Sequence, residues 1–267
     1  MFGDNAAVRP KEFIAIGARL KFSRHVHTLG FRPNFTDYSG DEQELIAAAS
    51  KIYYPTAFYA DLFNAMGKDT FPSFHTYKFA QNKIKQSAIF NLAGIPHPKT
   101  RVFYGPRQRK EILNRFDFPF VVKKPKGSSK GRHVFLISSL EDLESCLEKS
   151  GPVYAQSFIP VDRDMRIVVI GKCVALGYWR VAAASDFRTN VSQGGEICFD
   201  PLPQEALDLA LHTARVCGWD DVGIDIMQDK DRLVVIEANM KYGTQGFKKA
   251  GIDYRGFLEK LLLNGRI

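Results

Sequence analysis

The sequence predicts an α/β protein made of several small α+β lobes, and three observations carry this prediction. In residues 12–74 apolar strands alternate with helix signals, an order that favours a parallel sheet. Residues 118–137 place a Gly/Ser-rich turn between two apolar strands, which is typical of a hairpin. Residues 222–246 place oxygen-bearing side chains on two apolar runs joined by a polar turn. We therefore expect three lobes: an N-terminal α/β lobe at 1–80, a central lobe at 81–155 and a C-terminal lobe at 156–267.

Length and composition are those of a globular protein. The chain has 267 residues, of which 45% are hydrophobic and 25% charged, enough to bury a sizeable core. No apolar run approaches the ~20 residues that span a bilayer, and no secretory segment follows Met1. We therefore expect a cytoplasmic protein that does not bind membranes. Whether it forms a homo-oligomer is left open.

The net charge and the cysteine spacing bear on which partners and metals the protein binds. The net charge of +8 suits nucleic acid, an acidic protein or a phosphate-rich ligand. Because Lys and Arg are spread along the chain, nucleic-acid binding is not favoured as the main function. The four cysteines show no CxxC spacing, which argues against structural zinc and suits a reducing compartment; they are Cys146, Cys173, Cys198 and Cys217.

The N-terminal lobe is expected to hold strands at Phe13–Ile16 and Ile52–Tyr54. Ser39 and Glu42 have capping-box spacing and predict the start of a helix. Aromatic residues are dense between residues 58 and 79, with basic residues interleaved. Stacking on nucleic-acid bases uses such residues, but their mixed spacing favours a packed aromatic core.

The central lobe is predicted to begin with a helix over residues 82–92, capped by Asn82 and ended by the Gly/Pro-rich residues 94–98. Its apolar residues fall on one face: Ile84, Ala88, Ile89 and Leu92. Lys83 then lies near the N-terminal end of the helix. Taken alone, Lys83 is interpreted as a solvated charge.

A stronger signal follows at the Gly/Ser-rich turn. An apolar strand ends at Lys123, the segment Gly127–Gly131 comes next, and a strand returns at Val134–Ile137. Such a hairpin can close over phosphates with its backbone N–H groups and serine hydroxyls, while Lys123 supplies a fixed positive charge. The pattern GxxxxGK[ST] is absent, so this is not a Walker A loop. A solvated hairpin tip is the alternative interpretation.

The end of the central lobe and the C-terminal lobe are also predicted to contain both strands and helices. Ser139 and Asp142 form a second capping box, which predicts a helix to Lys149. Further strands and helices are predicted at Val153–Ile159, Ile167–Ile170, Cys173–Val181, Pro203–Val216 and Asp253–Leu263. Arg180, Arg188 and the turn Gly194–Gly195 follow strands. Arginine suits bidentate recognition of carboxylate or phosphate, although each arginine taken singly is as readily structural.

The acidic hairpin supplies the candidate metal ligands. Asp225 lies inside one apolar run, and Glu237 and Asn239 close the next. Side chains two apart in a strand point the same way, and the polar turn at residues 228–232 folds Asp225 opposite them. Oxygen donors in this arrangement suit Mg2+, with Mn2+ as the alternative cation. An amphipathic hairpin with a wet acidic face is the competing interpretation, but a carboxylate among apolar residues is costly to bury unpartnered.

Taken in order, these segments resemble the ATP-grasp superfamily over residues 82–253, and within it the RimK-like ligases of the α-L-glutamate ligase type. The motifs that carry the resemblance are Asn82-Lys83, Pro119–Lys123, Gly127–Ser129, Asp164–Arg166, Arg180, Asp186–Asn190, Gly194-Gly195, Gly223–Asp225, Glu237–Asn239 and Gly251–Asp253. The resemblance implies an ATP-grasp fold, with a small Rossmann-like N-terminal lobe and two α+β subdomains that grip ATP.

The resemblance also implies roles for single residues. Those that would meet the phosphates are Lys83, Lys123, Ser128, Ser129, Arg188 and Asn190. Those that would line the adenine hinge and the ribose are Gln156, Ser157, Phe158, Ile159 and Asp164. Those that would hold magnesium are Asp225, Glu237 and Asn239, and the catalytic cations would be Lys123, Arg166, Arg180 and Arg188.

The resemblance implies an ATP-dependent carboxylate–amine ligase that acts through an acyl phosphate. Its substrates would be ATP, a carboxylate acceptor (peptide, protein tail or small molecule) and an amino-acid amine such as glutamate. The motif departs from the family at Asn82, Ser157, Ser192–Gly195 and Met240–Gly243. The last two departures lie where the acceptor would bind, so they concern substrate identity and leave ATP use intact. The alternatives are a non-catalytic ATP-binding regulator, a phosphoryl transferase, or a ligase for a different amine.

Overall fold

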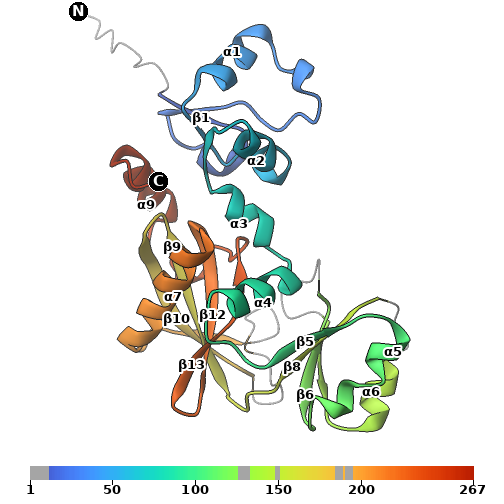
Figure 1. The fold of residues 1–267 in the computed structure, drawn as a ribbon. Helices are drawn as coiled ribbons and strands as arrows, with labels where there is room; N and C mark the ends of the chain where they lie inside the picture. The colour runs from blue at the N-terminus through green and yellow to red at the C-terminus, as the bar shows by residue number, and fades with distance from the viewer. Residues whose placement is uncertain (1–11, 126–132, 148–150, 184–188, 190–194) are drawn as a thin grey trace, which may run out of the picture. The chain divides into compact units, whose positions relative to one another are not determined.

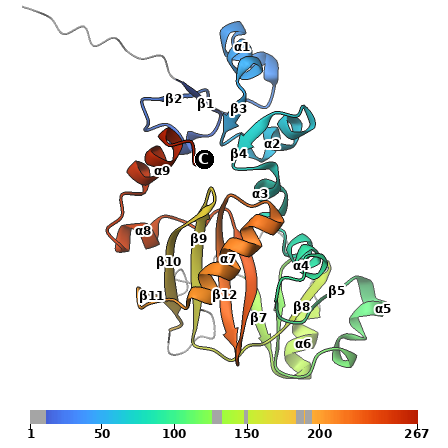
Figure 2. The same ribbon diagram turned by 60° about the vertical axis from the view of Figure 1, so that its left-hand side comes forward.

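The computed structural model describes residues 12–125, 133–147, 151–183, 189 and 195–267 (Figures 1 and 2). It is a mixed α/β protein, as the sequence predicts, and its described residues form three sheets. The chain groups into two compact units, one of Met1–Lys78 with Ile252–Ile267 and one of Phe79–Gly251. The three-lobe division with boundaries near residues 80 and 155 stays a prediction.

The first unit is built on a parallel four-stranded sheet of order β2-β1-β3-β4. Its strands are β1 (Phe13–Ala15), β2 (Val26–Thr28), β3 (Lys51–Tyr53) and β4 (Asp69–Phe71). The parallel arrangement and the strands β1 and β3 were expected. The strands β2 and β4 were not, because their sequences, Val-His-Thr and Asp-Thr-Phe, contain no apolar run that would mark a strand.

The first unit also contains short helices and an aromatic core. The helices are η1 (Ala18–Leu20), η2 (Phe35–Asp37), α1 (Gly40–Ala48) and α2 (Thr56–Ala65). The predicted capping box is present, with Ser39 accepting from the backbone N–H of Glu42 and the Glu42 carboxylate accepting from that of Ser39. Tyr59 stacks on Phe63 and both are buried, as an aromatic core requires. Phe58 is 49% exposed, so the predicted core does not take in every aromatic residue of this stretch.

The C-terminal helix α9 (Tyr254–Leu263) packs within the first unit, although we expected it in the C-terminal lobe. Its extent agrees with the prediction, and Asp253 caps it. Three hydrogen bonds account for its position: Arg19 donates to the Tyr254 hydroxyl (2.6 Å), Ser23 to Glu259 (2.7 Å), and Tyr53 to the Ile267 carbonyl (3.2 Å). These hydrogen bonds join residues more than two hundred positions apart, a range that local sequence patterns do not cover.

The second unit contains two antiparallel sheets. The smaller has the order β5-β8-β6-β7, with β5 (Thr100–Phe103), β6 (Phe120–Lys123), β7 (Val134–Ile137) and β8 (Val153–Ser157). The expected β6–β7 hairpin is confirmed, while its connection at residues 126–132 lies outside the described residues. The elements that accompany this sheet in the chain are α5 (Gly105–Arg109), η3 (Ile112–Asn114) and α6 (Leu140–Leu147), the last begun by the predicted Ser139 cap.

The larger sheet has the order β11-β10-β9-β12-β13. Its strands are β9 (Arg163–Ile170), β10 (Cys173–Val181), β11 (Glu196–Cys198), β12 (Asp221–Asp229) and β13 (Arg232–Asn239). We expected β9 to begin at Ile167, with Asp164 and Arg166 in the preceding loop. The strand instead starts at Arg163, because these charged side chains find partners directly across the sheet.

Helices cover this sheet and lead into it. They are α4 (Lys83–Leu92), α7 (Gln204–Cys217) and α8 (Gln245–Lys249). The short helix α3 (Phe74–Phe79) precedes α4 in the chain, and its residues up to Lys78 belong to the first unit. Helix α7 packs small residues against the sheet, with Ala206, Ala210 and Ala214 all buried. It ends at Gly218 as predicted, where a φ of 68° suits glycine. In the described part of the chain, no helix has the length and apolar content to cross a membrane.

Helix α4 buries a different face from the one its apolar pattern predicts. Asn82 caps the helix by accepting from Lys85 N–H, as expected. However, Leu92 is 88% exposed, and the buried positions are Lys83, Gln86, Ser87 and Phe90. Lys83 and Gln86 have hydrogen-bond partners on the larger sheet, and the Ser87 hydroxyl donates to the Ile84 carbonyl within the helix, which offsets the cost of burying them. The helix therefore delivers polar groups to the candidate site.

Candidate active site

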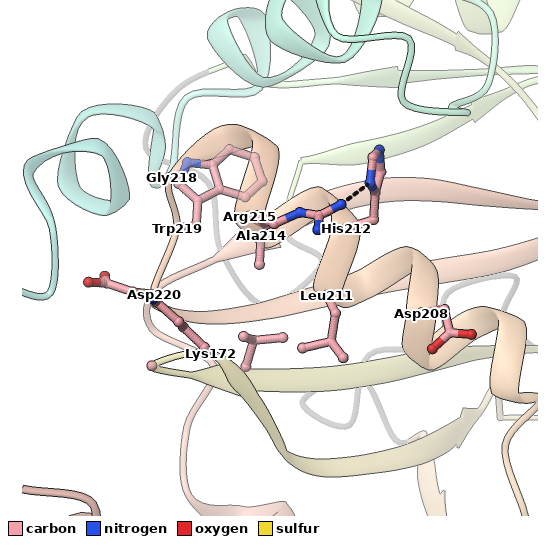
Figure 3. Close-up of a pocket in the computed structure, with 11 residues that line it drawn as sticks. Lys172, Asp208, Leu211, His212, Ala214, Arg215, Gly218, Trp219 and Asp220 are labelled. Atoms are coloured by element: carbon pink, nitrogen blue, oxygen red, sulfur yellow. Dashed lines mark hydrogen bonds between the residues drawn. The ribbon is translucent and has the colours of Figure 1, made fainter. Parts of the chain in front are cut away.

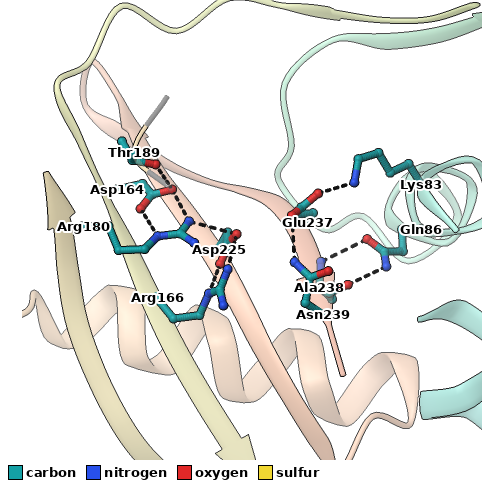
Figure 4. Close-up of polar contacts among 10 residues, drawn as sticks. All are labelled: Lys83, Gln86, Asp164, Arg166, Arg180, Thr189, Asp225, Glu237, Ala238 and Asn239. Atoms are coloured by element: carbon teal, nitrogen blue, oxygen red, sulfur yellow. Dashed lines mark hydrogen bonds and ion pairs between the residues drawn. The ribbon is translucent and has the colours of Figure 1, made fainter. Parts of the chain in front are cut away.

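Four charged side chains on strands β9, β10 and β12 meet with the hydroxyl group of a threonine that lies outside these strands (Figure 4). We name this group the arginine–aspartate cluster; its members are Asp164, Arg166, Arg180, Thr189 and Asp225. The antiparallel register places Asp164 directly opposite Arg180, and Arg166 directly opposite Asp225. Residues directly opposite in such a pair share a face of the sheet, so each acid meets a base.

The cluster is closed by mutual hydrogen bonds. Arg180 donates through Nε to Asp164 Oδ1 (2.7 Å), through Nη2 to Asp164 Oδ2, and through Nη2 to Asp225 Oδ2 (2.9 Å). Arg166 donates to both oxygens of Asp225, and the Thr189 hydroxyl donates to Asp164 (2.8 Å). Burial, with Asp225 nearby, raises the pKa of Asp164 although Arg180 lowers it. The two aspartates hold the pKa of Arg180 well above its usual range, against the effect of burial.

A second group, the lysine–glutamate cluster, consists of Lys83, Lys123, Glu237 and Asn239. Lys83, in the first turn of α4, donates to Glu237 Oε2, and the Asn239 amide donates to Glu237 Oε1 (2.7 Å). Burial alone would raise the pKa of Glu237, but the two lysines hold it far below its usual range. Two cations therefore share one carboxylate, and the cluster carries a net positive charge.

Lys123 connects this cluster to the smaller sheet. Its Nζ donates to Gln156 Oε1 (2.6 Å), and Gln156 donates in turn to the Thr100 hydroxyl (3.0 Å). Burial lowers the pKa of Lys123 to about 8, although the neighbouring Glu237 raises it. An ammonium group held in this way is short of counter-charge, which suits it to an anionic ligand.

The predicted hinge residues lie at the end of β8. Gln156 is inside the strand and buried, Ser157 ends it, and Phe158 and Ile159 follow. Ser157 N–H donates to the Lys99 carbonyl (2.9 Å). Contacts of these residues with adenine, and of Asp164 with a ribose, stay predictions. Four other predicted site residues fall outside the described residues: Ser128, Ser129, Arg188 and Asn190.

The structure adds Gln86, Thr100 and Thr189 to the residues predicted from sequence. The side chain of Gln86 is bonded to the backbone of β13 at Ala238, between Glu237 and Asn239. The sequence offered no motif for it. Its only signal was a polar residue three positions after Lys83, on the same face of the helix.

The predicted metal ligands can be tested for fit by their donor atoms. Asp225 is directly opposite Glu237 in the hairpin, and Asn239 is two positions further along β13, so the expected sharing of one face is confirmed. The described residues contain no group of three or more His, Cys, Asp or Glu that could hold a metal ion. Two carboxylates and an amide nevertheless form an all-oxygen set of the kind Mg2+ prefers.

The three donors differ in their free capacity. A carboxylate offers about four lone-pair sites. The Asp225 carboxylate accepts three hydrogen bonds from Arg166 and Arg180, which leaves about one site. Glu237 accepts two, from Lys83 and Asn239, and its side chain is 19% exposed. Glu237 and Asn239 therefore fit a divalent cation best, and Asp225 has room for a single further contact.

A pocket of about 700 Å³ lies elsewhere in the second unit, between α7 and the β9–β10 turn (Figure 3). Its walls include Lys172, Leu211, Arg215 and Trp219, and Arg215 is hydrogen-bonded to His212. None of the predicted site residues lines it. The pocket is therefore separate from both charged clusters.

Solved structures with a similar backbone define the class of protein. A RimK domain ATP-grasp protein from Sphaerobacter thermophilus matches with a TM-score of 0.67 at 18% identity, covering 91% of this chain and 97% of that one. The ATP-grasp ligase PsnB, in complex with a minimal precursor, Mg and ADP, matches with a TM-score of 0.68 at 16% identity, covering 96% and 98%. The fold is thus the ATP-grasp fold, as the sequence resemblance predicts.

Sequence comparison then gives the family. The model of the RimK-like ATP-grasp domain matches residues 80–261, and the chain belongs to that family. A probable α-L-glutamate ligase of Alkalilimnicola ehrlichii is 28% identical over 231 residues, which are 82% of this chain and 76% of the relative. The chain is therefore an enzyme of the ATP-grasp ligase class, which forms C–N bonds.

Proposed function

We propose that the protein joins the amino group of an amino acid to the carboxylate of an acceptor, with ATP as the energy source and ADP and phosphate as products. The observation that carries this proposal is the lysine–glutamate cluster: two lysines, one carboxylate and one amide drawn together from α4, β6 and β13. Its excess positive charge suits a polyphosphate, and its oxygen donors suit the cation that accompanies one.

The substrates are proposed from the family relationship. Glutamate is the first amino acid to test, because the Alkalilimnicola relative is named an α-L-glutamate ligase. The acceptor carboxylate would belong to a peptide, a protein tail or a small molecule. The PsnB complex with Mg and ADP supports Mg2+ and ATP for the same fold.

The proposed reaction has two steps. An acceptor carboxylate oxygen attacks the γ-phosphorus of ATP, and the bond to the β-phosphate oxygen breaks to release ADP. The unprotonated amine then attacks the carbonyl carbon of the acyl phosphate and an amide bond forms. Inorganic phosphate leaves with the electrons of the broken C–O bond and takes up the proton that the nitrogen loses. Neither step requires a side-chain nucleophile, so charge stabilisation and positioning are what the protein supplies.

Residues of the lysine–glutamate cluster would take the main roles. Lys83 and Lys123 would bind phosphate oxygens and stabilise the charge that moves to ADP. Glu237 and Asn239 would hold Mg2+, which when bound neutralises phosphate charge, and Asp225 would complete the set. Arg166 and Arg180 would fix the orientation of Asp225. Ser128, Ser129, Arg188 and Asn190 keep their predicted phosphate roles as part of this proposal.

The test is product analysis. The protein is incubated with ATP, Mg2+, isotopically labelled amino acids and a cell extract that supplies acceptors, and new labelled species are identified by mass spectrometry. We expect an amide product that contains labelled glutamate, and ADP release that depends on both substrates. A phosphorylated metabolite in place of an amide would indicate a kinase. ATP binding without any product from a complete metabolite pool would indicate a nucleotide sensor.

A further inference from the structure

Among the strands that the structure describes, β13 is at the edge of its sheet, and no other described strand pairs with one side of its backbone. Unpaired N–H and C=O groups at a buried edge are costly, and proteins cover them. Here the edge of β13 is covered by one residue of helix α4 and one residue that follows this helix. The Pro96 carbonyl accepts from Val235 N–H (2.8 Å), and the Gln86 side chain bonds to Ala238.

Gln86 acts on Ala238 as a strand would. Its Oε1 accepts from Ala238 N–H (3.0 Å) and its Nε2 donates to the Ala238 carbonyl (2.7 Å). The second Nε2 hydrogen is donated to the Phe79 carbonyl (2.9 Å), which fixes the amide plane. Gln86 is 3% exposed, so these bonds are shielded from water. The planar amide thus matches both polar groups of one backbone residue.

The bonded residue lies at a sensitive point of β13. Ile226 pairs with Val235 but Asp225 pairs with Glu237, so Ile236 is the extra residue of a bulge. Bulges bend a strand and re-aim the side chains that follow. Glu237 and Asn239 are those side chains, and Ala238 lies between them. The direction of both oxygen donors therefore depends on how the backbone is held just after the bulge.

We infer that Gln86 is a positioning residue for the cation site, holding the backbone of β13 so that Glu237 and Asn239 present their oxygens together. This inference rests on the proposed function, since it takes those two residues as the ligands of the divalent cation. Lys83, one helical turn before Gln86, bonds to Glu237 itself. Helix α4 therefore holds the end of β13 at two points, at the Glu237 carboxylate through Lys83 and at the Ala238 backbone through Gln86.

The test measures cation affinity directly. Mn2+ is titrated into the protein at saturating ADP and free Mn2+ is followed by electron paramagnetic resonance. Gln86→Met keeps the length of the side chain and removes its three hydrogen bonds. Because partners that orient metal ligands are worth about 10- to 100-fold in metal affinity, we expect Mn2+ to bind at least about tenfold more weakly.

Phe90→Leu is the matched control. Phe90 is buried on the same face of α4 and packs against Trp219, and its phenyl ring has no hydrogen-bonding group, so its truncation lowers stability without releasing Ala238. We expect its Mn2+ affinity to stay within about twofold of the unchanged protein. If Gln86→Met does not fold, Gln86→Glu takes its place. That variant keeps the acceptor for Ala238 N–H and sets an oxygen against two carbonyl groups, and the same loss is expected.

The outcomes separate this inference from the function on which it rests. Weaker Mn2+ binding in the Gln86 variant than in Phe90→Leu supports the positioning role. Equal affinities in the two variants overturn the positioning role and leave the proposed function standing. An unchanged protein that binds no Mn2+ in the presence of ADP overturns both.

Discussion

The second unit holds two groups of charged side chains that are built differently. The charged members of one lie on the neighbouring strands β9, β10 and β12, and the members of the other come from α4, β6 and β13. In the arginine–aspartate cluster two arginines face two aspartates, every carboxylate oxygen accepts a hydrogen bond, and Arg180 and Asp225 are 4% and 2% exposed. In the lysine–glutamate cluster two lysines face one glutamate, whose side chain is 19% exposed. In the first cluster the positive and negative charges are equal in number and the side chains are shielded from water. The second cluster has one more positive than negative charge.

This difference separates structural charges from charges that serve a ligand. A balanced, buried network consumes its own hydrogen-bonding capacity, so it specifies geometry and binds little else. In an unbalanced cluster the charged groups lack counter-charges that a ligand can supply. Burial lowers the pKa of Lys123 to about 8, and a bound phosphate would raise it. We therefore propose that the lysine–glutamate cluster binds the nucleotide phosphates and the cation, and that the arginine–aspartate cluster supports it.

The largest expected effect is on stability, in the arginine–aspartate cluster. Arg180→Met leaves Asp164 and Asp225 buried with fewer partners, and breaking a buried pair in this way costs about 3–5 kcal/mol. Urea denaturation should show this loss in the free energy of unfolding. Lys83→Met, the matched change in the other cluster, should cost less, because Glu237 keeps Asn239 as a partner and is reached by water.

A second variant checks the cause. Adding Asp164→Leu to Arg180→Met removes one of the stranded carboxylates, so part of the lost stability should return. Additive losses in the double variant would show that the two side chains do not act as a pair, and the account of this cluster would then be wrong.

The two clusters also differ in how far sequence could predict them. The acidic hairpin was predictable because apolar runs, a polar turn and the two-residue spacing of Glu237 and Asn239 are local signals. The pairing of Arg180 with Asp164 was not, because it depends on the register between two strands. Arg166 and Arg180 were expected to act as catalytic cations, and that role stays a prediction.

In helix α4, too, sequence predicted the local feature correctly and missed the feature that depends on another element. Its cap at Asn82 is a local signal and was predicted correctly. Its buried face was predicted from apolar residues, yet the helix buries Lys83 and Gln86, because β13 offers them partners that no pattern within the helix reveals. Ser128, Ser129, Arg188 and Asn190 lie outside the described residues, so their roles still rest on the family resemblance.

The next effect in size is catalytic and concerns Glu237→Gln. This change removes one anionic donor without opening a cavity. Ligation should fall by more than about 100-fold, since even the partners that orient metal ligands are worth about 10- to 100-fold. Steady-state ADP release at ordinary Mg2+ gives the rate, and circular dichroism checks the fold. Glu205→Gln, the same change on an exposed position of α7, should keep full activity; equal rates in both variants would falsify the role of Glu237.

The smallest effect is a proton taken up on nucleotide binding. The pKa of Lys123 is about 8, so near pH 8 about half of the ligand-free molecules lack the proton on this lysine. A bound polyphosphate favours the charged ammonium and raises this pKa, so binding should take up about half a proton at pH 8 and less at pH 7. Nucleotide affinity should accordingly fall as the pH rises above about 8.

Calorimetry in two buffers of different ionisation enthalpy measures this uptake. Lys123→Met should abolish it and weaken ADP binding. Uptake that persists in Lys123→Met would assign the proton to another group.

The assignment of the cation to the lysine–glutamate cluster is tested most directly by locating the ion. A crystal of the protein with ADP and Mn2+, measured where manganese scatters anomalously, gives the metal position without reference to any assumed ligand. We expect the strongest anomalous peak within coordination distance of Glu237 and Asn239, and the diphosphate between that peak and Lys123. A manganese peak away from both side chains, with ADP bound, would contradict the account.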